Sequence, residues 1–474
     1  MTALIATGID GLDKIFFGGV PEGSVMLVQG HAGAGKTTLG LQFLMEGIRQ
    51  GETCLLISVA QTEREVRHMA ESHDIDITQL HREFINPGEE DEPAQYAVAT
   101  QEEDLDDILD RIHAAVKKVK PDRLVLDSLL EMNLLAQSDY DYRRDVVRLK
   151  RQLVDIGTTA MIIDHVGEQR DPRIEGLMHG AILLDSLTPQ IGTTYRRLMI
   201  GKFRGHDFIE GWHDFDIAKG GLNIYARMVH NPRDLRHVGE TIGTGIDELD
   251  VMLGGGLEEA TVTLIAGQSG TGKSTLSSLF ASSAAAKGKN AGLFLFEERP
   301  EIYRDRSRGL GIDLSGEEGG GRIVIEHFAP NEVSVGHFTQ TILDRIEADD
   351  LDLVVVDSLS GFVSVLTERQ HLIPQFQAFL QQLARKNLLV IFTMTQHGLL
   401  GEAAQTEIDV SFLADSVILL RHSPEGSEIR RTIAVVKKRH SDHERRIRNF
   451  VISPGQVTVE DIDEGEKRQI ERRS

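Results

Sequence analysis

The stretch GHAGAGKT at residues 30–37 fits the phosphate-binding pattern G-x-x-x-x-G-K-[ST], and GQSGTGKS at residues 267–274 fits it again. The two matches start 237 residues apart, close to half of the 474-residue chain. In such a loop the glycines let backbone N–H groups wrap a phosphate, the lysine reaches the β- and γ-phosphates, and the hydroxyl ligates Mg²⁺. Two copies at matching positions predict two nucleotide-binding sites in one chain.

The repeat extends beyond the two loops. The run TGIDGLD at 7–13 returns as TGIDELD at 244–250, again 237 residues later. A short β-rich run precedes each loop, at 24–28 and at 261–265, and a helical run follows it, at 38–48 and at 275–286. This is the context that the motif requires. The residues predicted to bind ATP are Gly33, Ala34, Gly35, Lys36, Thr37 and Thr38 in the first loop and Gly270, Thr271, Gly272, Lys273, Ser274 and Thr275 in the second.

Each half then carries an apolar run that ends in an aspartate, Asp127 in the first and Asp357 in the second. Such runs are typical of buried parallel strands, whose C-terminal edge is where open α/β sheets bind ligands. We therefore expect Thr37 with Asp127, and Ser274 with Asp357, to hold Mg²⁺. The alternative is that each aspartate caps the helix that follows its strand.

Hydrolysis also needs a group that orients and activates water. The run LFLFEER at 293–299 places Glu297 and Glu298 directly after an apolar strand. The matching run LLISVAQT at 55–62 has no acid there, and Glu63 is out of register. The sequence therefore predicts that both sites bind nucleotide and that the second is better equipped for chemistry. The alternative for the two glutamates is plain surface charge.

A basic segment follows a strand late in each half, with Lys202 and Arg204 in the first and Lys437 and Arg439 in the second. In a chain of net charge −23, cations gathered at these places favour contact with phosphate. Because they lie far along each repeat, we expect them to reach the nucleotide of a neighbouring subunit. An ordinary charged hairpin is the alternative.

The length exceeds one typical hydrophobic core, so more than one domain is expected. The repeat pattern breaks near residues 229–240, which predicts an N-terminal domain over 1–232 and a C-terminal domain over 240–474 with a short polar tail. The negative net charge disfavours a broad DNA-binding surface, so a nucleic-acid partner is not expected.

The cysteine content and the apolar runs indicate where in the cell the protein is expected. The single cysteine, Cys54, cannot form an internal disulfide, which fits a reducing cytosol. The N-terminus has no signal-peptide pattern, and no apolar run is long enough to span a membrane. We therefore expect a cytoplasmic protein without a membrane partner.

Together these motifs resemble the KaiC family of tandem RecA-like ATPases, from Thr7 to about Ser453. The resemblance implies an α/β fold with two tandem RecA-like P-loop domains, each a mostly parallel twisted sheet flanked by helices. It also implies a two-tiered homo-hexamer with ATP between subunits, and basic segments that act in trans. Arg143 and Arg144 match a family arginine pair near the subunit interface.

The second domain of that family phosphorylates its own hydroxyl groups, and the matching stretch here is TEIDVSF at 406–412. Ser411 is retained at one acceptor position, Phe412 replaces the adjacent threonine, and Thr406 matches a threonine near the acceptors. Glu297 and Glu298 match the acids that act as base. The resemblance therefore implies autophosphorylation mainly on Ser411. The alternative is that Ser411 only caps the turn before the next strand.

The first domain departs from the family pattern, because Ala60 and Gln61 replace its paired acids. The leading hypothesis is an ATP-dependent, self-phosphorylating switch or timer. A RecA/DnaB-like DNA-dependent ATPase is the second, disfavoured by the charge and by the lack of a Lys/Arg arm. A scaffold that is stabilised by nucleotide and has little turnover is the third. Turnover of a Glu297 or Glu298 variant separates the scaffold from the leading hypothesis.

Overall fold

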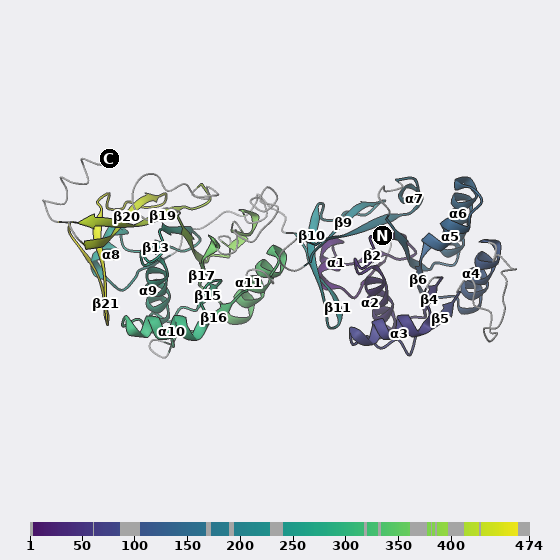
Figure 1. The fold of residues 1–474 in the computed structure, drawn as a ribbon, viewed down its shortest axis with the longest axis horizontal. Coiled ribbons are helices and arrows are strands. Elements are labelled where there is room, and N and C mark those ends of the chain that lie inside the picture. The colour runs from purple at the N-terminus through teal and green to yellow at the C-terminus, as the bar shows by residue number, and fades with distance from the viewer. Residues whose placement is uncertain are drawn as a thin grey trace. The chain divides into compact units, whose positions relative to one another are not determined.

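The chain forms two compact units, Met1–Arg227 and Met228–Ser474 (Figure 1). Each contains one sheet of nine strands and a separate pair of very short strands. The computed structural model describes residues 3–59, 61–85, 105–166, 172–188, 194–227, 240–316, 320–329, 333–360, 377–380, 382–383, 386–396, 412–425 and 428–462.

The sheet of the first unit has the strand order β11-β10-β9-β8-β3-β7-β6-β4-β5. The strands from β8 to β5 pair in parallel, and β9, β10 and β11 add to the β8 edge in antiparallel fashion. The strands are β1 (Leu4–Ile5), β2 (Val20–Pro21), β3 (Val25–Gly30), β4 (Cys54–Ser58), β5 (His81–Phe84), β6 (Arg123–Asp127), β7 (Thr159–His165), β8 (Gly180–Leu187), β9 (Tyr195–Phe203), β10 (Trp212–Ala218) and β11 (Gly221–Tyr225). The helices are α1 (Asp10–Ile15), α2 (Lys36–Arg49), α3 (Glu63–Ser72), α4 (Leu105–Val119), α5 (Leu129–Leu135), α6 (Asp139–Asp155) and α7 (Pro172–Leu177).

The second unit repeats this plan, with the order β16-β15-β17-β18-β14-β19-β20-β21-β22. Its strands are β12 (Thr241–Ile242), β13 (Leu257–Glu258), β14 (Val262–Gly267), β15 (Ala291–Leu295), β16 (Ile323–His327), β17 (Leu353–Asp357), β18 (Leu389–Thr395), β19 (Ser416–Glu425), β20 (Glu428–Lys438), β21 (Arg448–Ser453) and β22 (Gln456–Glu460). Its helices include α8 (Asp247–Met252), α9 (Lys273–Ala286), α10 (Pro300–Gly309) and α11 (Val335–Asp349). The predicted α/β architecture is confirmed.

The central strand of each sheet is buried on both faces. In β3, Val25 and Leu27 pack into one apolar cluster, whereas Met26 and Val28 pack into another. Successive side chains of a strand point to opposite faces, so helices must cover both. Helix α2 contacts β3, β4, β6 and β7 on one face, and α4, α5 and α6 contact strands of the same sheet. In the second unit α9 takes the place of α2 (Figure 1).

The repeated lead-in forms the same turn in both units. In the first, the backbone N–H and the hydroxyl of Thr7 donate to Asp13 Oδ1 at 2.7 and 2.8 Å. In the second, Thr244 donates in the same way to Asp250 Oδ1 at 2.6 and 2.8 Å. The repeated TGID-x-x-D sequence is therefore explained by one aspartate that holds the threonine six residues before it.

A buried arginine joins the lead-in to the core of the first unit. Arg123, at the start of β6, is fully buried and pairs with Glu52. Its guanidinium donates to Ala6 O at 2.7 Å and Phe43 O at 3.1 Å, and its Cζ lies 4.8 Å from the centre of the Phe43 ring. Its counterpart at the start of β17 is Leu353, so this contact belongs to the first unit alone.

No helix among the described residues is long and apolar enough to cross a membrane.

Arg123→Met should lower the free energy of unfolding of the first unit by about 3 kcal/mol, since it leaves Glu52, the buried carbonyl of Phe43 and the part-buried carbonyl of Ala6 without their donor. Trp212 is the single tryptophan of the chain and lies in this unit, so its fluorescence during urea unfolding reports the effect. Arg49→Met is the control, because the Arg49 side chain is 76% exposed. An unchanged midpoint for Arg123→Met would contradict the assigned role.

Candidate functional site

The two glycine loops have the same backbone geometry. Gly35 and Gly272 are the N-caps of α2 and α9 and adopt left-handed φ values of 95° and 101°. A Cβ on Gly272 would lie 2.6 Å from Ile452 Cδ1, so a side chain is excluded there by contact as well as by φ. Each loop therefore turns a buried strand directly into a helix whose first N–H groups are free to bind an anion.

The helices start earlier than the helical runs in the sequence suggest. Both begin at the lysine, so Lys36 with Thr37, and Lys273 with Ser274, lie in the first turn. The reason is the glycine cap, which lets the helix begin directly after the loop. This places the hydroxyl of Thr37 or Ser274 next to the edge of the sheet.

Both lysines lie over the loop that precedes them. Lys36 Nζ donates to Gly30 O at 2.6 Å and to His31 O at 2.9 Å. Lys273 Nζ donates to Gly267 O at 3.0 Å and to Gln268 O at 2.9 Å. Burial lowers the pKa of both lysines, while Asp127 and Asp357 act in the opposite sense. The arrangement places one cation at the mouth of each loop.

The strand-end aspartates meet the hydroxyl groups of the loops. Thr37 Oγ1 donates to Asp127 Oδ2 at 2.6 Å. In the second unit the side chain of Ser274 hydrogen-bonds Asp357. Burial raises the pKa of both carboxyl groups. Hydroxyl and carboxylate oxygens are the ligands that Mg²⁺ prefers, so the residues of both sites fit this ion.

Asp357 has a further partner that sequence reasoning missed. Thr393 Oγ1, on the neighbouring strand β18, donates to Asp357 Oδ1 at 2.5 Å. The matching position on β7 is Ile163, which offers no hydroxyl. Asp357 is therefore hydrogen-bonded from two elements, α9 through Ser274 and β18 through Thr393.

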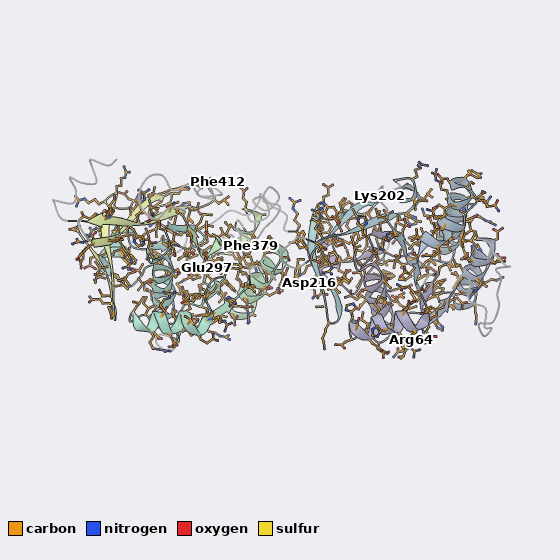
Figure 2. All side chains as sticks on the ribbon, viewed as in Figure 1. Arg64, Lys202, Asp216, Glu297, Phe379 and Phe412 are labelled. Atoms are coloured by element: carbon orange, nitrogen blue, oxygen red, sulfur yellow. The ribbon has the colours of Figure 1, made fainter. Side chains whose placement is uncertain are left out.

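Glu297, which is labelled in Figure 2, and Glu298 both follow β15. Their partners differ. Glu297 Oε1 accepts a hydrogen bond from Ser358 Oγ at 2.5 Å, and its charge acts on Lys273 and Asp357. Glu298 instead forms an ion pair with Arg306, whose Nη2 lies 2.9 Å from Glu298 Oε2. Of the two glutamates, Glu297 is the one whose charge acts on the lysine and the aspartate of the site.

The first site has a different set of polar groups. Gln61 stands where the second repeat has Glu298, and Ala60 lies outside the described residues. A carboxylate that the sequence analysis missed, Asp164, lies at the end of β7 and accepts from Gln29 Nε2 at 3.2 Å. Its charge acts on Lys36, and burial raises its pKa. It gave no sequence signal, since a single polar residue at a strand end is common.

The late basic segments do not lie beside the loop of their own unit. Lys202 pairs with Ala181 on β8, whereas the loop strand residue Gly30 pairs with Leu184. The second unit repeats this offset, with Lys437 opposite Val417 and Gly267 opposite Leu420. Three residues of strand correspond to about 10 Å, so these lysines lie away from the P-loop end of the strand.

The cations of these segments contact groups of their own unit. Arg204 Nη2 donates to Gly176 O and Lys437 Nζ to Ala414 O, both at 2.6 Å. Arg439 Nη1 lies 3.5 Å from Asp415 Oδ1. A one-residue register shift interrupts the β8–β9 and β19–β20 pairings next to Lys202 and Lys437, and such bulges re-aim side chains.

The other predicted residues divide into two groups. Arg143 and Arg144 both lie on α6, where Arg143 is 3.6 Å from Asp139 and Arg144 is 2.8 Å from Asp141. Ser411 and Thr406 lie outside the described residues. Phe412 is described and is 50% exposed.

The β19–β20 hairpin brings two further polar side chains to the second loop. Arg431 Nε donates to Gly270 O at 3.0 Å, and His422 Nε2 lies 3.1 Å from Ser269 O. Sequence reasoning missed both, although two arginines occur together in this strand, as they do at the matching place in β9. Arg431 adds positive charge beside the loop.

Comparisons with known proteins agree with this geometry. The model of the family described as "ATPase: KaiC" matches residues 5–229 and again 242–464. The chain is 30% identical over 461 residues to the circadian clock protein KaiC3 of a Synechocystis species, covering 94% of this chain and 90% of that protein. It is 28% identical to the circadian clock oscillator proteins KaiC of a Picosynechococcus species and of Synechococcus elongatus. These matches cover 96% and 97% of this chain, and 89% of each relative.

The two family matches coincide with the two nine-stranded sheets, so the units are tandem RecA-like domains of nucleotide-binding type. The chain belongs to the KaiC ATPase family.

Proposed function

We propose that this protein is a KaiC-like ATPase that binds Mg·ATP at both sites and carries out most of its phosphoryl chemistry at the second. The observation that carries the proposal is the position of Glu297, bonded to Ser358 and electrostatically coupled to Lys273 and Asp357. In this proposal the chain assembles as a two-tiered hexamer, phosphorylates itself on serine and acts as a signalling switch or timer.

The residues of the second site have separate roles in this proposal. The N–H groups of residues 270–275 and the ammonium of Lys273 hold the phosphates, and Ser274 with Asp357 would hold Mg²⁺, which offsets phosphate charge when bound. Glu297 takes the proton of the attacking oxygen, of water or of a serine. That oxygen bonds to the γ-phosphorus while the bond to the bridging oxygen of ADP breaks, and ADP leaves.

The first site holds its nucleotide with the corresponding groups, residues 33–38 with Lys36, and Thr37 with Asp127. It has no acid at the described end of β4, where Gln61 stands. Binding without a matched base supports a role of this site in assembly. The basic segments also support assembly. Lys202 and Lys437 lie about 10 Å along the strands from the loops of their own unit, which fits the expected contact with the nucleotide of a neighbouring subunit.

Glu297→Gln should lower the kcat of ATP hydrolysis by about a hundredfold while nucleotide affinity stays close to that of the wild type, since a general base contributes at that scale. Phosphate release and titration with a fluorescent ATP analogue measure the two quantities. Glu301→Gln, an exposed acid on α10, is the matched control. Unchanged turnover in Glu297→Gln would favour a scaffold with incidental hydrolysis.

Lys36→Ala and Lys273→Ala should differ. Losing Lys36 should mainly weaken ATP-dependent assembly, because nucleotide bound between subunits stabilises the oligomer by mass action. Losing Lys273 should mainly reduce turnover. Light scattering with and without Mg·ATP measures assembly. A wild-type monomer at saturating Mg·ATP would refute the hexamer, and equal losses in both variants would refute the division of roles.

Autophosphorylation should be confined mainly to Ser411, with Thr406 a minor acceptor. The reason is that transfer needs a hydroxyl in line with the γ-phosphate and close to a base, and Phe412 offers no second hydroxyl beside Ser411. Phosphopeptide mapping after incubation with Mg·ATP tests this on the wild type and on Ser411→Ala. Undiminished label in the variant, or none in either protein, would leave an ATPase without autokinase activity.

A further inference from the structure

A buried tyrosine ties the first turn of α9 to α10. Tyr303 lies on α10 and is 1% exposed. Its hydroxyl donates to Ser274 O at 3.1 Å and accepts from Ser278 Oγ at 2.9 Å. Ser278 Oγ is also 2.7 Å from Ser274 O. The carbonyl of a predicted Mg²⁺ ligand is thus held from the side of α10.

The same tyrosine supports the arginine that binds Glu298. The Cζ atom of Arg306 lies 4.7 Å from the centre of the Tyr303 ring. Its Nε lies 3.3 and 3.2 Å from the two carboxylate oxygens of Glu298, and its Nη2 lies 2.9 Å from Oε2. A planar guanidinium that stacks on a ring and binds a carboxylate through two nitrogens has little freedom to rotate.

Comparison of the two repeats shows that the network of Tyr303 and Arg306 occurs only in the unit that carries the paired glutamates. From the loop helix to the next helix (α2 to α3 in the first unit, α9 to α10 in the second), residues 237 positions apart correspond. The first unit has an apolar or neutral residue at each position that matches a side chain of this network. The pairs are Leu41 with Ser278, Gln61 with Glu298, Val66 with Tyr303, and Met69 with Arg306. Leu41 and Val66 are buried in the core of the first unit, and Met69 packs against that core. Besides Glu298 itself, three positions on two helices, α9 and α10, therefore change together with the presence of the paired acids.

Two adjacent carboxylates beside one lysine would repel each other and compete for it. The ion pair with Arg306 removes this competition, because it holds Glu298 on the α10 side. Glu297 keeps its hydrogen bond from Ser358, and its charge acts on Lys273. Tyr303 fixes Arg306 relative to the helix that carries Ser274. The orientation of the base is thereby linked to the nucleotide-binding helix.

We propose that Arg306 is a positioning residue of the second site, which acts through Glu298 to hold Glu297 toward the nucleotide, with Tyr303 as its support. This inference rests on the proposed role of Glu297 as base. It assigns to Arg306 no contact with substrate and predicts an effect on kcat, not on nucleotide affinity.

The test is a double-mutant cycle in the full-length chain with Arg306→Met, Glu298→Gln and the combined variant. Methionine is the residue of the first unit at this position, and Arg306 is 32% exposed, so the substitution is compatible with the fold. Arg306→Lys keeps the charge but loses the planar, two-nitrogen contact. Arg308→Met is the matched control, because Arg308 lies on the same helix, pairs with Asp305 and is 77% exposed. The readouts are kcat, KM, the affinity for a fluorescent ATP analogue, and the thermal midpoint.

We expect Arg306→Met to lower the Glu297-dependent part of kcat by about tenfold or more, which is a fraction of the full general-base effect. KM and the affinity for the ATP analogue should stay within about twofold of the wild-type values. Arg306→Lys should recover part of this loss, and Arg308→Met should resemble the wild type. The combined variant should be no slower than the worse single variant, since residues that act through one another are not additive.

Full kcat in Arg306→Met, or losses that multiply in the combined variant, would overturn the inference. A loss of kcat that merely follows a lower thermal midpoint would overturn it as well. The cycle is distinct from the test of the proposed function. If Glu297→Gln abolishes turnover while Arg306→Met has no effect, only the positioning role fails. If Glu297→Gln has no effect, the proposed base itself is wrong.

Discussion

Both units depend on one steric constraint, which is the close approach of a neighbouring strand to the point where the central strand ends. A Cβ on Gly30 would lie 2.6 Å from Leu184 O, and one on Gly267 would lie 2.4 Å from Leu420 O. Only glycine allows this contact, and a second, left-handed glycine then lets the helix begin at the lysine. Because this turn is short, the lysine, the hydroxyl and the strand-end aspartate lie together at the end of the central strand.

The same backbone carries different side chains in its two copies. The first unit uses a buried arginine, Arg123, to join its lead-in to the core, and it has apolar residues between α2 and α3. The second unit replaces that apolar contact with hydroxyl groups, a tyrosine and an arginine, and the arginine binds Glu298 after β15. A buried polar network is costly unless its groups are satisfied. Its presence in one unit only therefore supports a functional difference between the two sites.

The sequence predicted the features that depend on spacing along one segment. The strand, loop and helix around each lysine, and the aspartates that end β6 and β17, follow from local pattern and were confirmed by the structure. The partners of the two glutamates could not be predicted, because Arg306 belongs to the next helix and no motif marks it. Asp164 and Thr393 were missed for the same reason, since each acts across a strand pairing. Both loop helices begin two residues before the predicted starts at Thr38 and Thr275, because a left-handed glycine cap lets each helix start at the lysine.

The most direct test of the account is a cryo-electron microscopy structure of the full chain with Mg²⁺ and a non-hydrolysable ATP analogue. We expect nucleotide at both glycine loops, with Lys437 and Arg439 of a neighbouring subunit near the phosphates of the second. We also expect Glu297 to be the glutamate nearest the γ-phosphate and Glu298 to remain bonded to Arg306. A map in which Glu298 takes the place of Glu297, or in which the nucleotide contacts no second subunit, would contradict the account.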